Sequence, residues 1–277
     1  MHSIFPRLKR KILAALECLR YSLKVVHSDQ YFEIISCERN AGDFALKCLD
    51  SVYCQKYKRD KVTHIFIDDA SDDGTHEKIV GWLEKHPDHR VQYIHNSSRK
   101  GGTSNTVDGI KMASDNAIVI ELNGDDWLPD PHLLDFFCKI YSDDAIWMTY
   151  NSFRNINGPP SSNARRFPKE VIENNSFRDQ EGWSASHLHT FRKRLFDHLD
   201  DGVFIDPDSG QYWECADDQA LYLSMLELAG RHSRHINRIT YVYNFWESSH
   251  SHKDEAGSVA IAKRIRMGKR FQPLSGL

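Results

Sequence analysis

Apolar residues follow two different spacings between residues 31 and 150. Short runs rich in β-branched residues, bounded by loop-forming residues, predict strands. The segments between them repeat apolar positions every three or four residues, which is typical of helices. We expect strands at residues 33–37, 64–69, 91–94, 117–122 and 145–150. Strands that alternate with helices in this way predict a doubly wound, mainly parallel α/β sheet.

The pattern changes after residue 150. Residues 151–175 are rich in Asn, Pro, Ser and Gly and predict a long loop, which in a compact domain is usually functional or disordered. Residues 183–192 alternate polar and apolar positions and predict a strand with His187 and His189 on one face. Apolar content predicts a helix that starts near Asp217, and a last strand over residues 238–246.

The first thirty residues predict a basic amphipathic helix. Between Ile4 and Val26 the apolar positions recur at helical spacing, and the only acid is Glu17. Such a helix either packs on the domain or lies on an anionic membrane surface, and the pattern leaves both readings open. The apolar stripe consists of Leu8, Ile12, Leu16, Leu19 and Leu23, and the basic residues are Arg7, Lys9, Arg10, Lys11, Arg20 and Lys24.

The far end of the chain is also basic, with no acid after Glu255. It either touches the same membrane or forms an ordinary solvated face. We therefore expect three parts: the N-terminal helix (1–30), one α/β domain (31–246) with halves 31–150 and 151–246, and a C-terminal tail (247–277). The basic residues of the tail are Lys263, Arg264, Arg266, Lys269 and Arg270.

Composition narrows the function classes. The 277-residue chain has a net charge of −3, which argues against nucleic acid as an electrostatic partner. Its six cysteines include no Cys-x-x-Cys pair, so we expect neither a disulfide framework nor a cysteine zinc site. This pattern favours a protein of a reducing compartment. No stretch approaches the ~18 uninterrupted apolar residues of a membrane span. We expect a cytoplasmic location, with or without peripheral attachment to the inner face of the membrane.

Paired acids follow two of the expected strands. Asp68-Asp69 and Asp125-Asp126 each end an apolar run, and parallel strands place their carboxyl ends on one rim of the sheet. Adjacent carboxylates repel each other unless a cation lies between them, and Mg²⁺ or Mn²⁺ bridging to a phosphate meets that need. A single pair is equally compatible with a solvated turn. Two pairs on one rim favour a nucleotide site.

Four blocks in the first half resemble family 2 of the glycosyltransferases, inverting enzymes of the GT-A fold that use nucleotide sugars. The blocks are residues 32–40, 48–52, 67–75 and 123–129. The resemblance implies that Asp69 binds the uracil or ribose of the donor and that Cys37, Glu38 and Arg39 line the base. It also implies that Asn123, Gly124 and Asp125 contact the donor, and that Asp125 and Asp126 bind the metal.

The chain departs from the family pattern at three places. Asn123 occupies the first position of the Asp-x-Asp motif, and residues 37–40 read Cys-Glu-Arg-Asn instead of the common Pro-Thr-Tyr-Asn. Thr106 stands where an arginine is usual, so Arg99 or Lys100 is expected to meet the diphosphate. Some relatives use a histidine after the last strand as a further metal ligand, which makes His250 and His252 candidates.

A third acidic pair, Asp217-Asp218, opens the expected helix. Acids are favoured at a helix N-terminus by its dipole, so a capping role is one reading. The resemblance implies another: Asp218 is the general base, with Asp217 in the place of the family's glutamate. A carboxylate base suits the chemistry because an acceptor hydroxyl is a poor nucleophile near neutral pH.

Three further residues are candidates for the acceptor cleft: His187 and His189 on one face of the expected strand, and Trp213, which is close in sequence to Asp218. His187 and His189 either line the cleft, bind a transition metal or belong to an ordinary half-exposed strand. Trp213 either stacks on a sugar ring or belongs to the core.

The sequence therefore predicts a metal-dependent inverting glycosyltransferase. We expect it to use Mn²⁺ or Mg²⁺ and a nucleoside-diphosphate sugar, with a UDP-sugar favoured because Asp69 is a base-contacting acid. The expected acceptor is a hydroxyl of a glycan or lipid-linked molecule in surface polysaccharide biosynthesis. The alternative is a catalytically silent relative that acts as a membrane-associated binding module. The oligomeric state, the sugar and the acceptor have no signature in the sequence.

Overall fold

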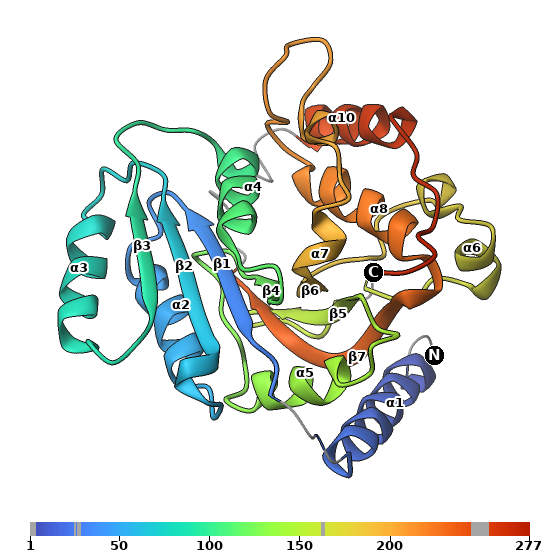
Figure 1. Ribbon diagram of the computed structural model, residues 1–277, viewed down its shortest axis with the longest axis horizontal. Coiled ribbons are helices and arrows are strands. Elements are labelled where there is room, and N and C mark those ends of the chain that lie inside the picture. The colour runs from blue at the N-terminus through green and yellow to red at the C-terminus, as the bar shows by residue number, and fades with distance from the viewer. Residues whose placement is uncertain (1–3, 25, 27–28, 162–163, 245–254) are drawn as a thin grey trace.

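The computed structural model describes residues 4–24, 26, 29–161, 164–244 and 255–277. Its centre is a seven-stranded sheet with the order β3-β2-β1-β4-β6-β5-β7 (Figure 1). The strands are β1 (Phe32–Glu38), β2 (Val62–Asp68), β3 (Val91–His95), β4 (Ile118–Glu121), β5 (Met148–Asn155), β6 (His189–Arg192) and β7 (Ser233–Tyr243). Pairings along the sheet are parallel except those of β6, which runs antiparallel to both β4 and β5. The predicted GT-A-like, mostly parallel sheet is confirmed.

Helices cover both faces of the sheet because its strands are apolar on both sides. Alternate residues of β1 point to opposite faces: Ile34 belongs to one buried apolar cluster and Ile35 to the other. The first face packs α2 (Asp43–Tyr53), α3 (Thr75–Lys85) and α5 (Leu133–Tyr141). The second packs α4 (Gly102–Met112), α6 (Lys169–Glu173), α7 (Lys193–Phe196), α8 (Asp217–Ala229) and α10 (Glu255–Met267).

The second half of the chain differs from the prediction at several boundaries. The segment predicted as a loop continues β5 to Asn155 and later forms α6. The strand expected from residue 183 begins only at His189, because residues 183–188 form bends and irregular backbone. The last strand begins at Ser233, five residues earlier than predicted, where it pairs with β5. Alternation of polar and apolar residues predicts that a strand exists, but it does not predict the residue at which pairing with the neighbouring strand begins.

The first helix, α1 (Ile4–Ser22), lies outside the sheet beside β7 and α5 (Figure 1). Glu17 accepts hydrogen bonds from the backbone N–H groups of Asn237 (2.8 Å) and Arg238 (3.2 Å). Tyr21 is buried against Phe136. The residues of the apolar stripe are exposed, from 51% at Ile12 to 74% at Leu23. Within the described residues, no helix has the length and apolar content to cross a membrane.

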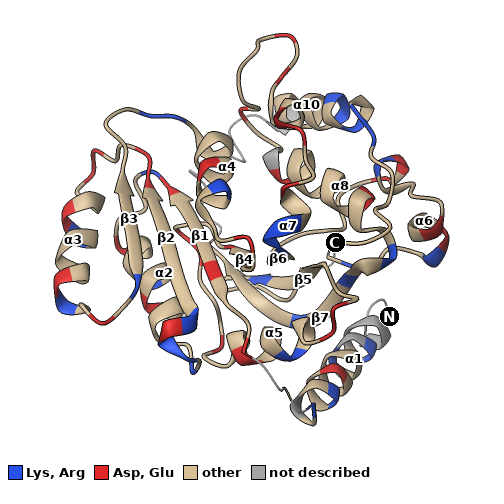
Figure 2. Cartoon of the chain, viewed as in Figure 1, with Lys and Arg blue, Asp and Glu red and all other residues tan. Residues whose placement is uncertain are grey.

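The basic tail folds back onto the domain. Figure 2 shows its arginines and lysines at the end of α10 and in the segment that follows. Arg264 pairs with Asp206 and Asp208, and Arg270 pairs with Asp179. Arg266 donates to the side chain of Gln219 (2.9 Å) and to three backbone carbonyls. These three cations therefore have partners within the protein itself, and contact of the tail with a membrane stays a prediction.

Candidate active site

Three acids meet at the carboxyl ends of the parallel strands. Glu38 ends β1, Asp69 follows β2 and Asp125 follows β4. Burial raises the pKa of Glu38 to about 8, and the charge of Asp125, a hydrogen bond with it and the charge of Asp69 add to the effect. The rim is thus a place where negative charge is crowded and poorly hydrated.

Gly124 allows the chain after β4 to approach β1 closely. A Cβ atom at this position would lie 2.7 Å from the Cβ of Glu38 and 3.0 Å from the ring of Phe66. Any larger residue would push the loop, and Asp125 with it, away from Glu38. Gly124 therefore acts through the shape of the backbone, which places Asp125 beside Glu38.

Asp69 holds the loop between β3 and α4. Its carboxylate accepts from the backbone N–H groups of Lys100 (2.8 Å) and Gly101 (2.9 Å) and from the amide of Asn96 (3.0 Å). Burial alone raises the pKa of Asp69, but these hydrogen bonds and that of Asn105 outweigh it, so the pKa is lowered. Asp69 is a fixed carboxylate at the rim.

The other candidates for donor contact border this rim. Cys37 is half-buried at the end of β1. Arg39 spans the turn after β2, donating to the carbonyl of Ala70 (3.3 Å) and pairing with Asp72 (2.6 Å). Arg99 is exposed in the loop before α4, and the Lys100 ammonium lies 3.5 Å from Asp108. Arg99 and Lys100 are thus in the same loop that Asp69 fixes.

Asp126 points away from the rim. The carboxylate is fully buried, accepts from the backbone N–H of Asn244 (2.6 Å) and is hydrogen-bonded by the Tyr241 hydroxyl. Burial, with the charge of Asp125, holds the pKa of Asp126 well above its usual range. These hydrogen bonds tie the loop after β4 to β7. Of the two predicted metal ligands we retain Asp125, whose side chain is hydrogen-bonded with Glu38 at the rim.

Asp218 lies at the start of α8 and lines a small cavity. Glu121 and Tyr222 line it as well, together with Thr103 and Thr106 from α4. Burial and the charge of Glu121 raise the pKa of Asp218, and the nearby His189 opposes them. A half-buried carboxylate with a raised pKa, facing a cavity, has the properties of a general base.

Glu121 is a buried acid that sequence reasoning missed. It accepts from the hydroxyl of Tyr222 (2.6 Å) and lies 3.2 Å from Nδ1 of His189. Burial alone raises the pKa of Glu121, but these groups hold it below its usual value. The available signal was a charge inside the apolar run Ile118–Leu122, because an unpaired charge there is costly and indicates partners.

The two histidines of the predicted acceptor face lie close to this acid. Both nitrogens of His189 have protein partners, Glu121 and the carbonyl of Ala185 (2.8 Å), and its ring stacks on Tyr222. His187 stacks on Tyr241, and burial together with His189 lowers its pKa to about 4. The ligand atoms of Glu121, His187 and His189 lie within 4.8 Å of one another. His189 therefore orients Glu121, and only the half-buried His187 remains a candidate for acceptor contact.

Trp213 belongs to the core. It is 6% exposed, donates its indole N–H to the carbonyl of Val203 (3.0 Å) and lies under the guanidinium of Arg264. Because Trp213 is buried with these contacts, we favour the reading in which it belongs to the core over stacking on a sugar ring. His250 and His252 lie outside the described residues, and Asp217 is described only as the first residue of α8.

The rim acids and the Asp218 cavity are electrostatic neighbours. Burial raises the pKa of Tyr241 well above its usual range, and the charges of Asp126, Asp125 and Glu121 add to the effect. Glu121, the last residue of β4, also lines the Asp218 cavity, so this cavity lies at the carboxyl end of the strand that leads to Asp125. The carboxyl ends of the strands are where open α/β sheets bind their ligands.

The chain belongs to glycosyl transferase family 2. The family's model matches residues 33–200, more than half of the chain. This stretch contains the strands that carry Glu38, Asp69, Glu121 and Asp125, whereas Asp218 lies beyond it. No curated protein matches the chain.

Solved structures with the same fold are glycosyltransferases of low sequence identity. TarS of S. aureus (residues 1–349), in complex with UDP-GlcNAc, matches with a TM-score of 0.61 and 16% identity over 81% of this chain and 61% of that one. PcManGT of Pyrobaculum calidifontis, a mannosyltransferase in complex with GDP-Man and Mn²⁺, matches with a TM-score of 0.60 and 18% identity over 95% of this chain and 74% of that one.

GalNAc-T7, solved with UDP, GalNAc and Mn²⁺, has a TM-score of 0.57 and 15% identity over 80% of this chain and 45% of that one. This chain therefore spans about three fifths of the TarS chain and less than half of GalNAc-T7. At these identities the likeness concerns the fold.

Proposed function

We propose that this protein is a metal-dependent inverting glycosyltransferase that moves a sugar from a nucleoside-diphosphate sugar to an acceptor hydroxyl. The observation that carries the proposal is the pairing of two features on one rim: the crowded acids Glu38, Asp69 and Asp125, and the half-buried Asp218 facing a cavity. The first feature suits a cation and a diphosphate, and the second suits a base.

Asp218 is the proposed general base. Its carboxylate takes the proton of the acceptor hydroxyl as the new bond to the anomeric carbon forms. Glu121 raises its proton affinity, and Gln219 donates its backbone N–H to one oxygen (2.8 Å), which fixes the side chain. Displacement in a single step from the side opposite the leaving group inverts the anomeric centre.

The residues at the rim fit a hard divalent cation, Mn²⁺ or Mg²⁺. The ligands these ions prefer are carboxylate oxygens. Burial is the main reason that the pKa of Glu38 is raised, and the charges of Asp125 and Asp69 add to it, so a cation at this place relieves their repulsion. Asp125 would hold the ion, and His250 and His252 remain further candidate ligands. When bound, the cation neutralises charge on the departing nucleoside diphosphate.

We assign the nucleotide to the side of the rim formed by Asp69 and the loop before α4. Asp69 fixes the loop that carries Arg99 and Lys100, and both side chains are exposed cations available to a diphosphate. Cys37, Glu38 and Arg39 border the same space. UDP is the favoured nucleotide, as in TarS and GalNAc-T7, and GDP, as in PcManGT, is the alternative to test. The acceptor we propose is a glycan or lipid-linked hydroxyl of a surface polysaccharide.

The Asp218→Asn variant tests the base. Asparagine keeps the size of the side chain but cannot take a proton, so we expect kcat to fall by about 10²–10⁴-fold. UDP affinity, measured by calorimetry with Mn²⁺, is expected to stay unchanged because Asp218 lies outside the nucleotide side of the rim. Near-normal turnover of this variant contradicts the base assignment.

The Asp125→Asn variant tests the cation site. We expect UDP binding to lose its dependence on Mn²⁺, since one anionic ligand is removed from the ion. Asp115→Asn, in which an exposed acid in the turn before β4 changes instead, is the matched control and should bind as the native protein does. Mn²⁺-dependent UDP binding without transfer to any acceptor would favour the alternative function, a silent binding relative.

A further inference from the structure

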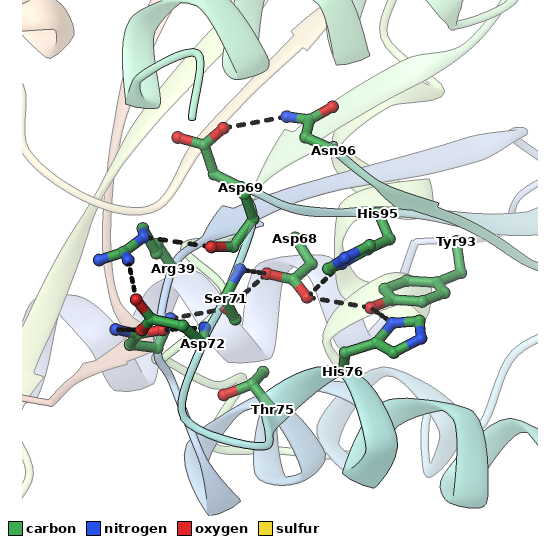
Figure 3. Close-up of polar contacts among 12 residues, drawn as sticks. Arg39, Asp68, Asp69, Ser71, Asp72, Thr75, His76, Tyr93, His95 and Asn96 are labelled. Carbon is green, nitrogen blue, oxygen red and sulfur yellow. Dashed lines mark hydrogen bonds and ion pairs between the residues drawn. The ribbon is translucent and has the colours of Figure 1, made fainter. Parts of the chain in front are cut away.

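A second group of metal-binding side chains lies on the other side of the turn after β2. Asp68 ends β2, His95 ends β3 and His76 lies in the first turn of α3 (Figure 3). One ligand atom from each residue lies within 4.8 Å of the others. Three consecutive elements of the fold thus bring two imidazoles and one carboxylate together.

The carboxylate of this group is held in place. Its Oδ1 accepts from the backbone N–H of Ser71 (3.0 Å) and from the Ser71 hydroxyl, and its Oδ2 lies 2.9 Å from Nδ1 of His95. Tyr93 also donates to Oδ2 (3.1 Å). Outer hydrogen bonds of this kind fix the orientation of metal ligands. Asp68 is therefore positioned before any ligand arrives.

The two imidazoles face each other next to that carboxylate. The rings of His76 and His95 lie 4.2 Å apart, and Nδ1 of His76 is 2.9 Å from the Tyr93 hydroxyl. Asp68 is fully buried, but the side chain of His95 is 36% exposed. The group is closed on the protein side and open toward solvent, which leaves room for a water ligand.

This group is separate from the nucleotide side of the rim. Asp68 and Asp69 are adjacent, yet Figure 3 shows their carboxylates pointing in different directions. Asp69 points to Asn96 and the loop before α4, whereas Asp68 points to His95 and Tyr93. A cation at Asp68 therefore uses none of the side chains assigned to the donor.

We propose that Asp68, His76 and His95 bind one first-row divalent transition ion, with Zn²⁺ as its best representative. Two imidazole nitrogens and one carboxylate oxygen are a ligand set that Zn²⁺ accepts, with bonds of about 2.0–2.2 Å and water in a fourth position. Imidazole ligands discriminate against Mg²⁺ and Ca²⁺, which prefer oxygen. The ligand atoms need only small side-chain movements to reach one ion.

Binding joins three elements of the fold. The ion links the ends of β2 and β3 to the start of α3, and the turn between β2 and α3 includes Asp69 and Asp72. An ion that binds only the folded protein raises its melting temperature. The bound site thus stabilises the turn next to the donor side.

The test is a titration of the full chain, free of any histidine tag, with Zn²⁺ in the absence of nucleotide. We expect His76→Gln to weaken one Zn²⁺ site by at least about 10-fold and to remove the Zn²⁺-induced rise in melting temperature. His198→Gln, which changes an exposed histidine far from the group in sequence, is the matched control and should titrate like the native chain.

Two further variants decide the location. Asp68→Asn keeps the shape that Ser71 recognises, and it is expected to lose the same site. His187→Gln alters the other histidine group, beside Glu121, and is expected to leave the site intact. Native Zn²⁺ affinity and stoichiometry in both His76→Gln and Asp68→Asn overturn the proposal, and so does loss of the site in His187→Gln alone. A variant that melts like the native chain without Zn²⁺ shows that its loss of binding is not misfolding.

Discussion

The environment of Asp218 determines how a base at this position works. Burial and Glu121 raise its pKa, while His189 lowers it. Burial lowers the pKa of the nearby Arg266 in α10, and the charge of Asp218 opposes that effect. A raised proton affinity helps a base to remove a proton, but it also keeps the carboxyl protonated to a higher pH than usual. Catalytic efficiency and pH range are therefore linked through one side chain.

The pH dependence of kcat follows from this shift. The base must be ionised, so kcat should fall as the pH falls through the pKa of Asp218. The midpoint is expected above about 3.9, the usual value for an aspartate, because burial and Glu121 raise it. The measurement is kcat at saturating donor, acceptor and Mn²⁺ across the acid range where the protein stays folded. A midpoint at or below the usual value, or the same acid limb in Asp218→Asn, contradicts the assignment.

Asp125 and Asp126 show where sequence reasoning stops at the residue scale. Both were predicted as metal ligands because they follow a strand side by side. Their roles differ because the partners of Asp126, Tyr241 and Asn244, are 115 and 118 residues away in sequence. The pattern around residue 125 contains no information on them. Glu121 is the opposite case, since a charge inside an apolar strand was visible in the sequence.

At the scale of elements, a buried ion pair joins three helical segments. Arg178, in the short 3-10 turn Phe177–Asp179, pairs with Glu227 of α8 at 2.7 Å. It also donates to the carbonyl of Ile265 in α10 (2.6 Å), and Glu227 accepts from the backbone N–H of Phe271 (3.0 Å). Both charged side chains are at most 3% exposed. The C-terminal segment is thereby fastened to the helix that begins at Asp218.

Replacing Arg178 by Ala should therefore destabilise the fold. The change leaves the Glu227 carboxylate buried without its partner, and we expect a loss of about 3–5 kcal/mol in the free energy of unfolding. Urea denaturation measures it. Arg270→Ala is the matched control: it breaks an exposed pair with Asp179 in the same region, and about 0–1 kcal/mol is expected. Equal costs for the two variants would mean that burial does not decide the strength of the Arg178 pair.

The contacts of the C-terminal tail could not be predicted because its partners, like those of Asp126, are distant in sequence. Its charges suggested a surface partner, but their partners are acids scattered between Asp179 and Asp208. Local spacing predicts a helix or a strand, whereas pairing between distant segments depends on the completed fold. The α10 helix also forms here, and its apolar residue Ile265 belongs to the core beneath α8.

At the scale of the molecule, the central sheet was the most predictable feature. The strands β1 to β4 have apolar runs with clear ends, and each is followed or preceded by an amphipathic helix. Parallel pairing then places their carboxyl ends on one rim, so Asp69 and Asp125 could be placed from sequence alone. The antiparallel β6 could not, because a strand of four residues has no periodicity that reveals its direction.

The remaining feature of the whole molecule is the exposed apolar face of α1. Glu17 and Tyr21 attach the helix to β7, so the helix packs on the domain, and its leucines are still exposed to solvent. Exposed lysines and arginines accompany the stripe, among them Lys9, Lys11 and Arg20. We propose that this face lies on an anionic membrane surface, where the apolar side chains enter the lipid and the cations meet headgroups.

Replacing Ile12, Leu16 and Leu19 together by Ser tests this proposal. These side chains are 51–57% exposed, so the fold and UDP binding should be preserved. Even a loss of about 1 kcal/mol for each side chain, below the value for full burial, lowers vesicle binding by about 100-fold. Sedimentation with phosphatidylserine vesicles measures this.

The matched control is Val80→Ser with Met112→Ser, since both residues are exposed apolar positions outside α1. Because the cations contribute through screened charge, native binding should also weaken with added salt. If the triple variant sediments as the native protein does, the leucine face serves another purpose and the membrane proposal is wrong.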